Sequence, residues 1–209
     1  MEMNTLILFV IAALSINLIP GPDVIYIVAN TMKGNIKSGI EASLGLAVGY
    51  LIHTLAAVLG LSALILSSAF LFTVVKYLGA MYLLYLGVTS LINCYRSNSK
   101  FYAESTDEKQ GNIFKQGIIV SVFNPKVAIF FLAFLPQFID PMASNATSEL
   151  FLLGVLFSVM ATMCNLFYAS LGSVLFSSPN AKRYSRILEG VSGTILIGLS
   201  AKIAFSSNK

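Results

Sequence analysis

The chain has 209 residues, of which 56% are hydrophobic and only 11% are charged, and its mean hydropathy is +0.82. Soluble domains carry about 25% charged residues, so this composition excludes an ordinary soluble domain and indicates an all-α integral membrane protein. The net charge of +4 does not indicate nucleic-acid binding, because the basic residues do not form one patch in the sequence.

Six apolar stretches are each long enough to cross a bilayer, which takes about 20 predominantly apolar residues. A polar segment divides these stretches into two groups of three. We therefore expect six transmembrane helices in two three-helix repeats, residues 1–94 and 113–209, joined by a cytoplasmic linker loop over residues 95–112. The six expected spans cover residues 5–30, 41–67, 71–93, 114–136, 149–176 and 187–205.

The first span is interrupted by I-P-G-P-D-V-I at residues 19–25. Proline and glycine disfavour a helix interior, and a buried aspartate needs a partner or a proton. Gly21 and Pro22 suit the start of a new helix inside the membrane, since glycine is an accepted N-cap and proline favours the first helical position. Such a break leaves free N–H groups that suit an anion. The alternative is a proline kink whose backbone groups are satisfied by neighbouring helices.

The second span contains the only histidine of the chain, in G-Y-L-I-H-T. His53 is either a hydrogen-bonded packing residue or a proton carrier, because the charge of a histidine changes near physiological pH. The third span carries Y-L-G-A-M-Y-L-L-Y-L-G at residues 77–87, with two glycines eight residues apart.

The fourth span repeats the pattern of the first. N-P-K-V-A-I-F-F at 124–131 aligns with G-P-D-V-I-Y-I-V at 21–28, and L-E-G-V-S-G-T-I-L-I-G at 188–198 matches the glycine spacing of the third span. A repeat of three spans inserts upside-down relative to its twin, so we expect inverted repeats, as in many secondary transporters. Inversion would bring the two breaks together near mid-membrane, in a substrate site of Pro20, Gly21, Pro22, Asp23, Asn124, Pro125 and Lys126.

Two charges follow the breaks, and each suits one end of an amino acid. Lys126 can attract a carboxylate, while Asp23 can hold the lysine charge or receive an amine; alternatively, the two form an ion pair that only joins the repeats. Asp23 and His53 are the candidates for proton coupling. Further polar residues at membrane depth either line the site or form interhelical hydrogen bonds, namely Asn17, Tyr26, Asn165 and Tyr168.

No cofactor or metal site is expected. Cys94 and Cys164 form no CxxC and are read as small buried residues rather than redox or metal groups. With one histidine, no HExxH and no clustered acids, a membrane enzyme is not expected. A small channel and a six-helix redox carrier are the other classes considered, although a redox carrier would want cysteines in the broken spans.

The basic residues indicate the orientation, because cytoplasmic loops carry the excess of lysine and arginine. On the predicted spans, nine bases fall in one set of loops and three on the opposite side, so both termini should be external. The nine are Lys33, Lys37, Arg96, Lys100, Lys109, Lys115, Lys182, Arg183 and Arg186, and the three are Lys76, Lys202 and Lys209.

These motifs resemble the lysine exporter (LysE/RhtB) family of bacterial amino-acid exporters. The resemblance is carried by P-G-P at 20–22, G-L-A-V-G-Y-L-I-H at 45–53, K-Y-L-G-A-M-Y-L-L-Y-L-G at 76–87 and N-P-K-V-A-I-F-F-L-A-F-L-P-Q-F at 124–138. It implies a six-helix inner-membrane exporter of amino acids or close derivatives, working by proton antiport. Its motif positions here are Pro20, Gly21, Pro22, Asn124, Pro125 and Lys126. The expected partners are an amino-acid substrate and the lipid bilayer, with no nucleic acid; a homo-oligomer is left open.

Overall fold

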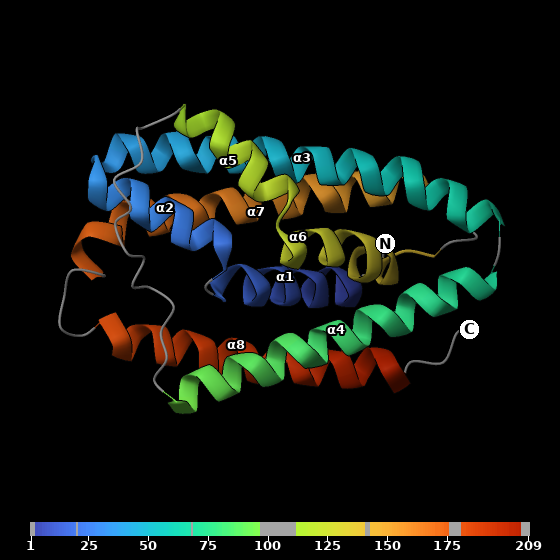
Figure 1. Cartoon of the computed structure of the whole chain (residues 1–209). Coiled ribbons are helices and arrows are strands. Elements are labelled where there is room, and N and C mark those ends of the chain that lie inside the picture. The colour runs from blue at the N-terminus through green and yellow to red at the C-terminus, as the bar shows by residue number, and fades with distance from the viewer. Residues whose placement is uncertain are drawn as a thin grey trace.

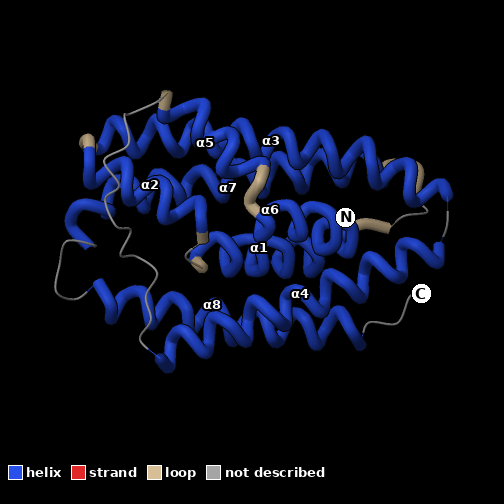
Figure 2. Tube along the Cα trace, viewed as in Figure 1, coloured by secondary structure: helices blue, strands red, loops and turns tan. Residues whose placement is uncertain are grey.

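The computed structural model describes residues 3–19, 21–67, 69–96, 112–140, 143–175 and 181–205, and in this part of the chain every regular element is a helix (Figures 1 and 2). The elements are α1 (Met3–Leu18), α2 (Pro22–Lys33), α3 (Ile36–Ser67), α4 (Ala69–Arg96), α5 (Ile113–Val122), α6 (Pro125–Ile129), the π-helix η1 (Phe130–Phe134), the 3₁₀-helix η2 (Leu135–Phe138), α7 (Ala146–Leu175) and α8 (Ala181–Phe205).

The all-helical prediction is confirmed, and the number of spans is confirmed in part. Within the described residues, α3 and α7 are each long and apolar enough to cross a membrane. Two broken elements also qualify if each crosses as one span: α1 with α2, bent by 52°, and α5 with Pro125–Phe138, bent by 47°. The structure therefore gives two to four spans among the described residues, rather than six. Helices α4 and α8 lie where the third and sixth spans were predicted, and their role as spans stays a prediction.

The bundle has a central aromatic core. Figure 1 shows α1 and α6 between the α3–α7 side of the molecule and the α4–α8 pair. Phe9 of α1 packs edge-on against Phe138 at 5.3 Å between ring centroids, and Phe130 stacks on Phe157 of α7 at 4.4 Å. Ring pairs of this kind contribute about 0.5–1.5 kcal/mol beyond the area that they bury. The core therefore holds the second broken element against α1 and α7.

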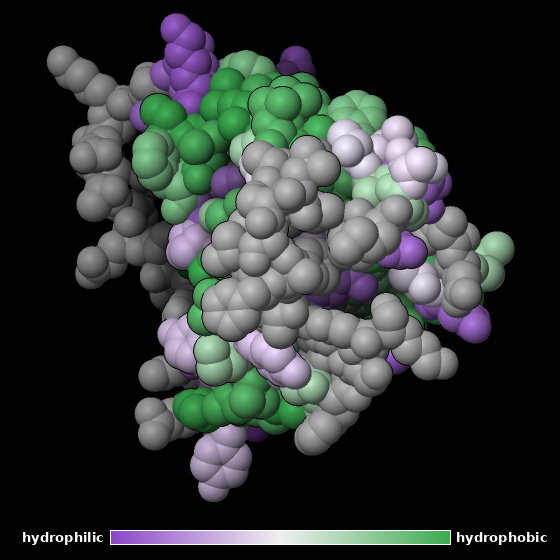
Figure 3. Space-filling view, turned by 90° about the vertical axis from the view of Figure 1, so that its right-hand side faces the viewer, coloured by the Kyte–Doolittle hydropathy of each residue, from purple (hydrophilic) through white to green (hydrophobic). Residues whose placement is uncertain are grey.

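The outer surface is apolar as well. Leu59, Leu152 and Met163 are each at least 65% exposed, and the end-on view of Figure 3 shows hydrophobic side chains over much of the described surface. Monomeric soluble proteins rarely expose apolar patches larger than a few hundred Å². This surface is explained by contact with lipid, as expected for a membrane protein.

Two helix pairs approach so closely that only small residues fit between them. A Cβ atom added at Gly117 of α5 would lie 2.8 Å from the carbonyl oxygen of Ala42 on α3. In the antiparallel pair α4–α8, a Cβ at Gly87 would lie 2.9 Å from the carbonyl oxygen of Gly193, and one at Gly193 would lie 2.8 Å from that of Gly87. Small residues at such crossings let the backbones of membrane helices touch, and this packing fixes α4 against α8.

We expect Gly87→Ala to destabilise the protein, whereas Gly198→Ala should not. Both substitutions gain the same helix propensity, but Gly198 has open space around it, while the new methyl at Gly87 would meet the Gly193 backbone. Overpacking of this kind costs about 1–3 kcal/mol. Thermal unfolding of the purified variants in detergent measures the difference. Equal melting temperatures for the two variants would contradict the close crossing.

Candidate functional site

Both broken elements restart at the prolines that the sequence indicated. Helix α2 begins at Pro22, with Gly21 as an extended N-cap whose carbonyl oxygen accepts from the backbone N–H of Ile25 at 3.0 Å. Helix α6 begins at Pro125, and the side chain of its N-cap Asn124 accepts from the backbone N–H of Lys126 at 3.1 Å. The predicted helix starts are therefore confirmed. Pro20, which was assigned to the same site, lies outside the described residues.

The two breaks meet through a buried ion pair. The Lys126 Nζ atom lies 3.1 Å from Oδ1 of Asp23, and their side chains are only 7% and 1% exposed. A buried pair is strongly coupled, because removing one partner leaves an uncompensated charge. The structure thus brings together Gly21, Pro22, Asp23, Asn124, Pro125 and Lys126 from distant parts of the chain.

Two side chains from other elements complete the carbonyl end of α1. Lys126 Nζ donates a second hydrogen bond, to the carbonyl oxygen of Ile19 at 3.1 Å. The Tyr168 hydroxyl donates to the carbonyl oxygen of Leu18, also at 3.1 Å. The last carbonyls of a helix have no partner within it and carry a partial negative charge, so a cation and a hydroxyl suit this place. Tyr168 therefore contacts the first helix break directly, through the Leu18 carbonyl.

Gly21 leaves room for the ion pair. A Cβ atom at this position would lie 2.8 Å from Oδ1 of Asp23 and 2.9 Å from Nζ of Lys126. Real Cβ atoms essentially never approach other heavy atoms closer than 3.0 Å. A larger residue here would therefore force the ends of these two side chains to shift, whereas the extended backbone is one that any residue could adopt.

Two buried polar atoms beside the pair have no hydrogen-bond partner in the structure, Oδ2 of Asp23 and Nδ2 of Asn124. Leaving such an atom unsatisfied costs about 1–3 kcal/mol, and most buried polar atoms in proteins are satisfied. One is a carboxylate oxygen, which accepts, and the other is an amide nitrogen, which donates. A ligand that carries both a donor and an acceptor would satisfy both atoms.

Tyr50 belongs to the surroundings of the pair, although sequence reasoning did not select it. Its hydroxyl accepts from Nδ2 of Asn165 at 2.9 Å, and it also interacts with the Asp23 carboxylate, whose Oδ2 makes no hydrogen bond of standard geometry. The residue is fully buried, with its ring edge-on to Phe157 at 5.9 Å. The sequence could have indicated Tyr50, because it lies on α3 almost one helical turn before His53 and so on a similar side of that helix.

Cys164 lies on α7, which packs against α2. Both Cys164 and Cys94 are free thiols of intermediate exposure, and neither lies in a broken element. Among the described residues, no group of three or more His, Cys, Asp or Glu is placed to hold a metal ion.

His53 contacts the second break rather than the ion pair. Its Nε2 atom lies 3.1 Å from the carbonyl oxygen of Ser121, near the end of α5, and its ring stacks on Phe131 at 5.7 Å. Because a carbonyl oxygen only accepts, Nε2 must carry the hydrogen, which leaves Nδ1 without that proton in the neutral ring. This hydrogen bond suits a packing role for His53, and it also places the imidazole at the second break, so both alternatives from the sequence stay open.

The four candidate lining residues each donate a hydrogen bond. Asn165 donates to Tyr50, and Tyr168 donates to the carbonyl end of α1. Tyr26 instead donates to the carbonyl oxygen of Ile113 at 2.7 Å and so joins α2 to the start of α5. Asn17 donates within its own helix, to the carbonyl oxygen of Ala13 at 2.7 Å. Tyr26, Asn165 and Tyr168 thus each form an interhelical hydrogen bond, the alternative that the sequence left open for these residues.

The chain is similar to known membrane proteins. A family model described as LysE type translocator matches residues 14–207. The chain is 31% identical to an uncharacterized membrane protein of Bacillus subtilis, YrhP, over 98% of this chain and 100% of that protein. It is 30% identical to the leucine efflux protein of Salmonella typhimurium, over 94% of this chain and 92% of that one. No solved structure matches it.

Proposed function

Since the chain belongs to the LysE type translocator family, we propose that it exports amino acids across the bacterial inner membrane, with leucine as the first substrate to test. Members of this family are translocators, so the prediction of a membrane transporter rather than an enzyme is confirmed. The substrate is suggested by relatives that are named leucine efflux proteins.

The observation that carries this proposal is the buried ion pair at the two helix breaks. A free amino acid has an ammonium and a carboxylate on one carbon, and it can insert between Asp23 and Lys126. In this proposal its carboxylate meets Lys126, Nδ2 of Asn124 and the start of α6, where a helix N-terminus favours an anion. Its amine meets Oδ2 of Asp23. Both atoms left without a partner in the structure then gain one.

An apolar side chain on the substrate has suitable surroundings. Tyr50 packs on Phe157, which contacts Phe131 at 5.0 Å between ring centroids. These rings come from three different elements around the break and are at most 1% exposed, so in this proposal they move apart to contact an apolar substrate side chain. Leucine fits this environment better than a substrate with a second charged group.

We further propose that the two halves are inverted repeats that move around the site. The equivalent elements of the two halves contact each other: α3 packs on α7, α4 packs on α8, and the two breaks share the ion pair. In transporters with inverted repeats, the substrate binds between the repeats and access alternates by the rocking of one against the other.

Transport by cells tests the function and its selectivity together. Cells that express the protein are loaded with dipeptides, and intracellular peptidases raise each free amino acid in turn. We expect saturable release of leucine that exceeds the release from cells without the protein. Release that rises linearly with internal leucine would instead indicate a channel, and release of basic amino acids alone would contradict the proposed selectivity.

The proposed energy source is the proton gradient, because the sequence has no G-x-x-x-x-G-K-[ST] nucleotide-binding loop. We expect a protonophore to stop leucine efflux while ATP stays high. If His53 takes part, His53→Gln should retain export but change its pH dependence, since glutamine can still donate to the Ser121 carbonyl but cannot carry a proton. Efflux measured in proteoliposomes at a series of pH values checks this. An unaltered pH profile would assign His53 to packing.

The proposed topology has its own test. Single cysteines at Ser99 and Ser207, in a background without Cys94 and Cys164, should react oppositely with an impermeant thiol reagent in intact cells. We expect only Ser207→Cys to be labelled from outside, because the bases cluster on the side of the 95–112 loop. Labelling of Ser99→Cys alone would reverse the orientation.

A further inference from the structure

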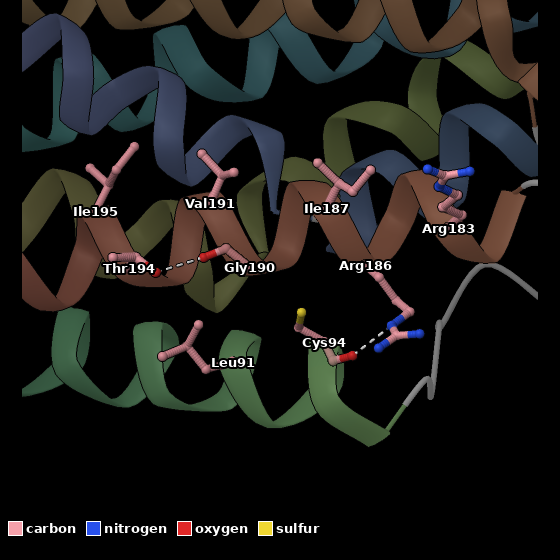
Figure 4. Close-up of a pocket in the computed structure, with 9 residues that line it drawn as sticks. All are labelled: Leu91, Cys94, Arg183, Arg186, Ile187, Gly190, Val191, Thr194 and Ile195. Carbon is pink, nitrogen blue, oxygen red and sulfur yellow. Dashed lines mark hydrogen bonds between the residues drawn. The ribbon is translucent and has the colours of Figure 1, made fainter.

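A groove away from the ion pair runs along one side of α8, where α8 meets the end of α4 (Figure 4). Its volume is about 850 Å³. Most of its wall is apolar, with Ile187, Val191 and Ile195 spaced by about one turn on α8 and Leu91 opposite on α4. Ile187 and Val191 are more than half exposed, so the groove is open to the surroundings of the bundle.

One end of the groove is positively charged. Arg183 and Arg186 lie there, and both are exposed. Figure 4 shows the Arg183 guanidinium on the same side of α8 as Ile187, while Arg186 reaches toward α4. The Nε atom of Arg186 donates to the carbonyl oxygen of Cys94 at 2.9 Å. This bond fixes the guanidinium at the mouth of the groove and leaves its other N–H groups available.

Both arginines lie on the side where the basic residues cluster, and Arg183, in the first turn of α8, also opposes the helix dipole. They lie in the first turns of α8, where no acidic residue accompanies them in the first turn. A base at a helix N-terminus is unfavourable, because it faces the positive end of the helix dipole. An anion held there would reverse the sign of this effect. Arginine binds phosphate with paired N–H donors, and basic pockets between membrane helices recognise anionic lipid headgroups.

We propose that this groove binds an anionic phospholipid, with the headgroup phosphate at Arg183 and Arg186 and an acyl chain along Ile187, Val191 and Ile195. The charge and the shape indicate the same occupant: an inorganic anion would not cover the apolar wall, and a neutral lipid would offer no anionic group to the two guanidinium groups. The site is separate from the transport function and does not depend on it.

The absence of tryptophan from the chain makes a direct test available. A single tryptophan introduced by Val191→Trp reports on the groove, and one introduced by Phe167→Trp, at a position of similar exposure on α7, serves as the matched control. Each variant is reconstituted into phosphatidylcholine vesicles. A small fraction of the lipid is replaced either by phosphatidylglycerol or by phosphatidylcholine, in both instances with brominated acyl chains that quench the fluorescence.

We expect brominated phosphatidylglycerol to quench the Val191→Trp variant at least twofold more than brominated phosphatidylcholine, and to show no such preference in the Phe167→Trp variant. Adding Arg183→Gln and Arg186→Gln should remove the preference, whereas Lys202→Gln, an exposed base at the other end of α8, should leave it intact. Arg183→Gln alone keeps the bond from Arg186 to α4 and should halve the preference, which guards against misfolding of the double variant.

Four results would overturn the proposal. Equal quenching by the two lipids at position 191 would exclude selection of an anionic lipid. A preference that persists without both arginines, or that is equal at position 167, would show general enrichment of anionic lipid. Quenching by neither lipid would show that something else, such as a second copy of the chain, fills the groove.

Discussion

Lys126→Met is expected to reduce leucine export to less than a tenth of the unsubstituted rate. Methionine keeps much of the apolar stem of lysine but removes the charge that we assign to the substrate carboxylate. It also leaves Asp23 buried without its partner, which costs about 3–5 kcal/mol. Efflux from dipeptide-loaded cells measures the loss, with the amount of protein in the membrane measured in parallel. Lys202→Met, which removes an exposed base from α8, is the matched control and should export normally.

The double variant Asp23→Asn with Lys126→Met separates binding from structure. If the pair only joins the two halves, removing both charges relieves the unpaired carboxylate and restores activity, because replacing a whole buried pair is often neutral. If the pair meets the substrate, the double variant should insert and fold normally yet stay inactive. If the double variant regains export, the assignment of Asp23 and Lys126 to the substrate site is wrong. The fold and the family membership are unaffected by that result.

Gly21→Ala is expected to lower export at least tenfold without preventing insertion. The added methyl would lie within 3 Å of both Oδ1 of Asp23 and Nζ of Lys126, so the two side chains must move apart. The helix start itself should survive, because the backbone at this position is extended and suits alanine.

Gly60→Ala is the matched control for this substitution, since Gly60 has no neighbour within 4 Å of the added atom. Comparing the concentration dependence of efflux tells which step is lost. We expect the apparent affinity for leucine to fall in Gly21→Ala, because the charges that hold the substrate are displaced. Unchanged affinity and rate would show that the ion pair tolerates the methyl and that the geometry of the site is less strict than described.

The local features of the two breaks could be predicted from the sequence. A proline after a glycine or an asparagine specifies a helix start through backbone chemistry alone, and both starts lie at the predicted residues. The pairing of Asp23 with Lys126 was also among the expectations, because isolated charges are costly in an apolar environment.

The partners of the breaks could not be predicted in the same way. The contact of Tyr168 with Leu18 joins residues 150 positions apart, and that of Tyr50 with Asn165 joins residues 115 apart. Such contacts depend on the rotation of α3 and α7 about their axes, which apolar residues on all sides of a helix do not determine. The π-helix η1 after the second break was not predicted either. No local sequence signal indicates it, and its aromatic residues pack on rings from other elements.

The separation of the two charges along the chain has a consequence for synthesis of the protein. Asp23 and Lys126 are 103 residues apart, so the ribosome, adding roughly 5–20 residues per second, makes the lysine about 5–20 s after the aspartate. During this interval the first half enters the membrane with its carboxylate and the end of α1 still lacking their partner. Arrival of α6 then supplies both at once. Closing the ion pair is therefore a late step of biogenesis, which joins the two halves only after the second one has been made.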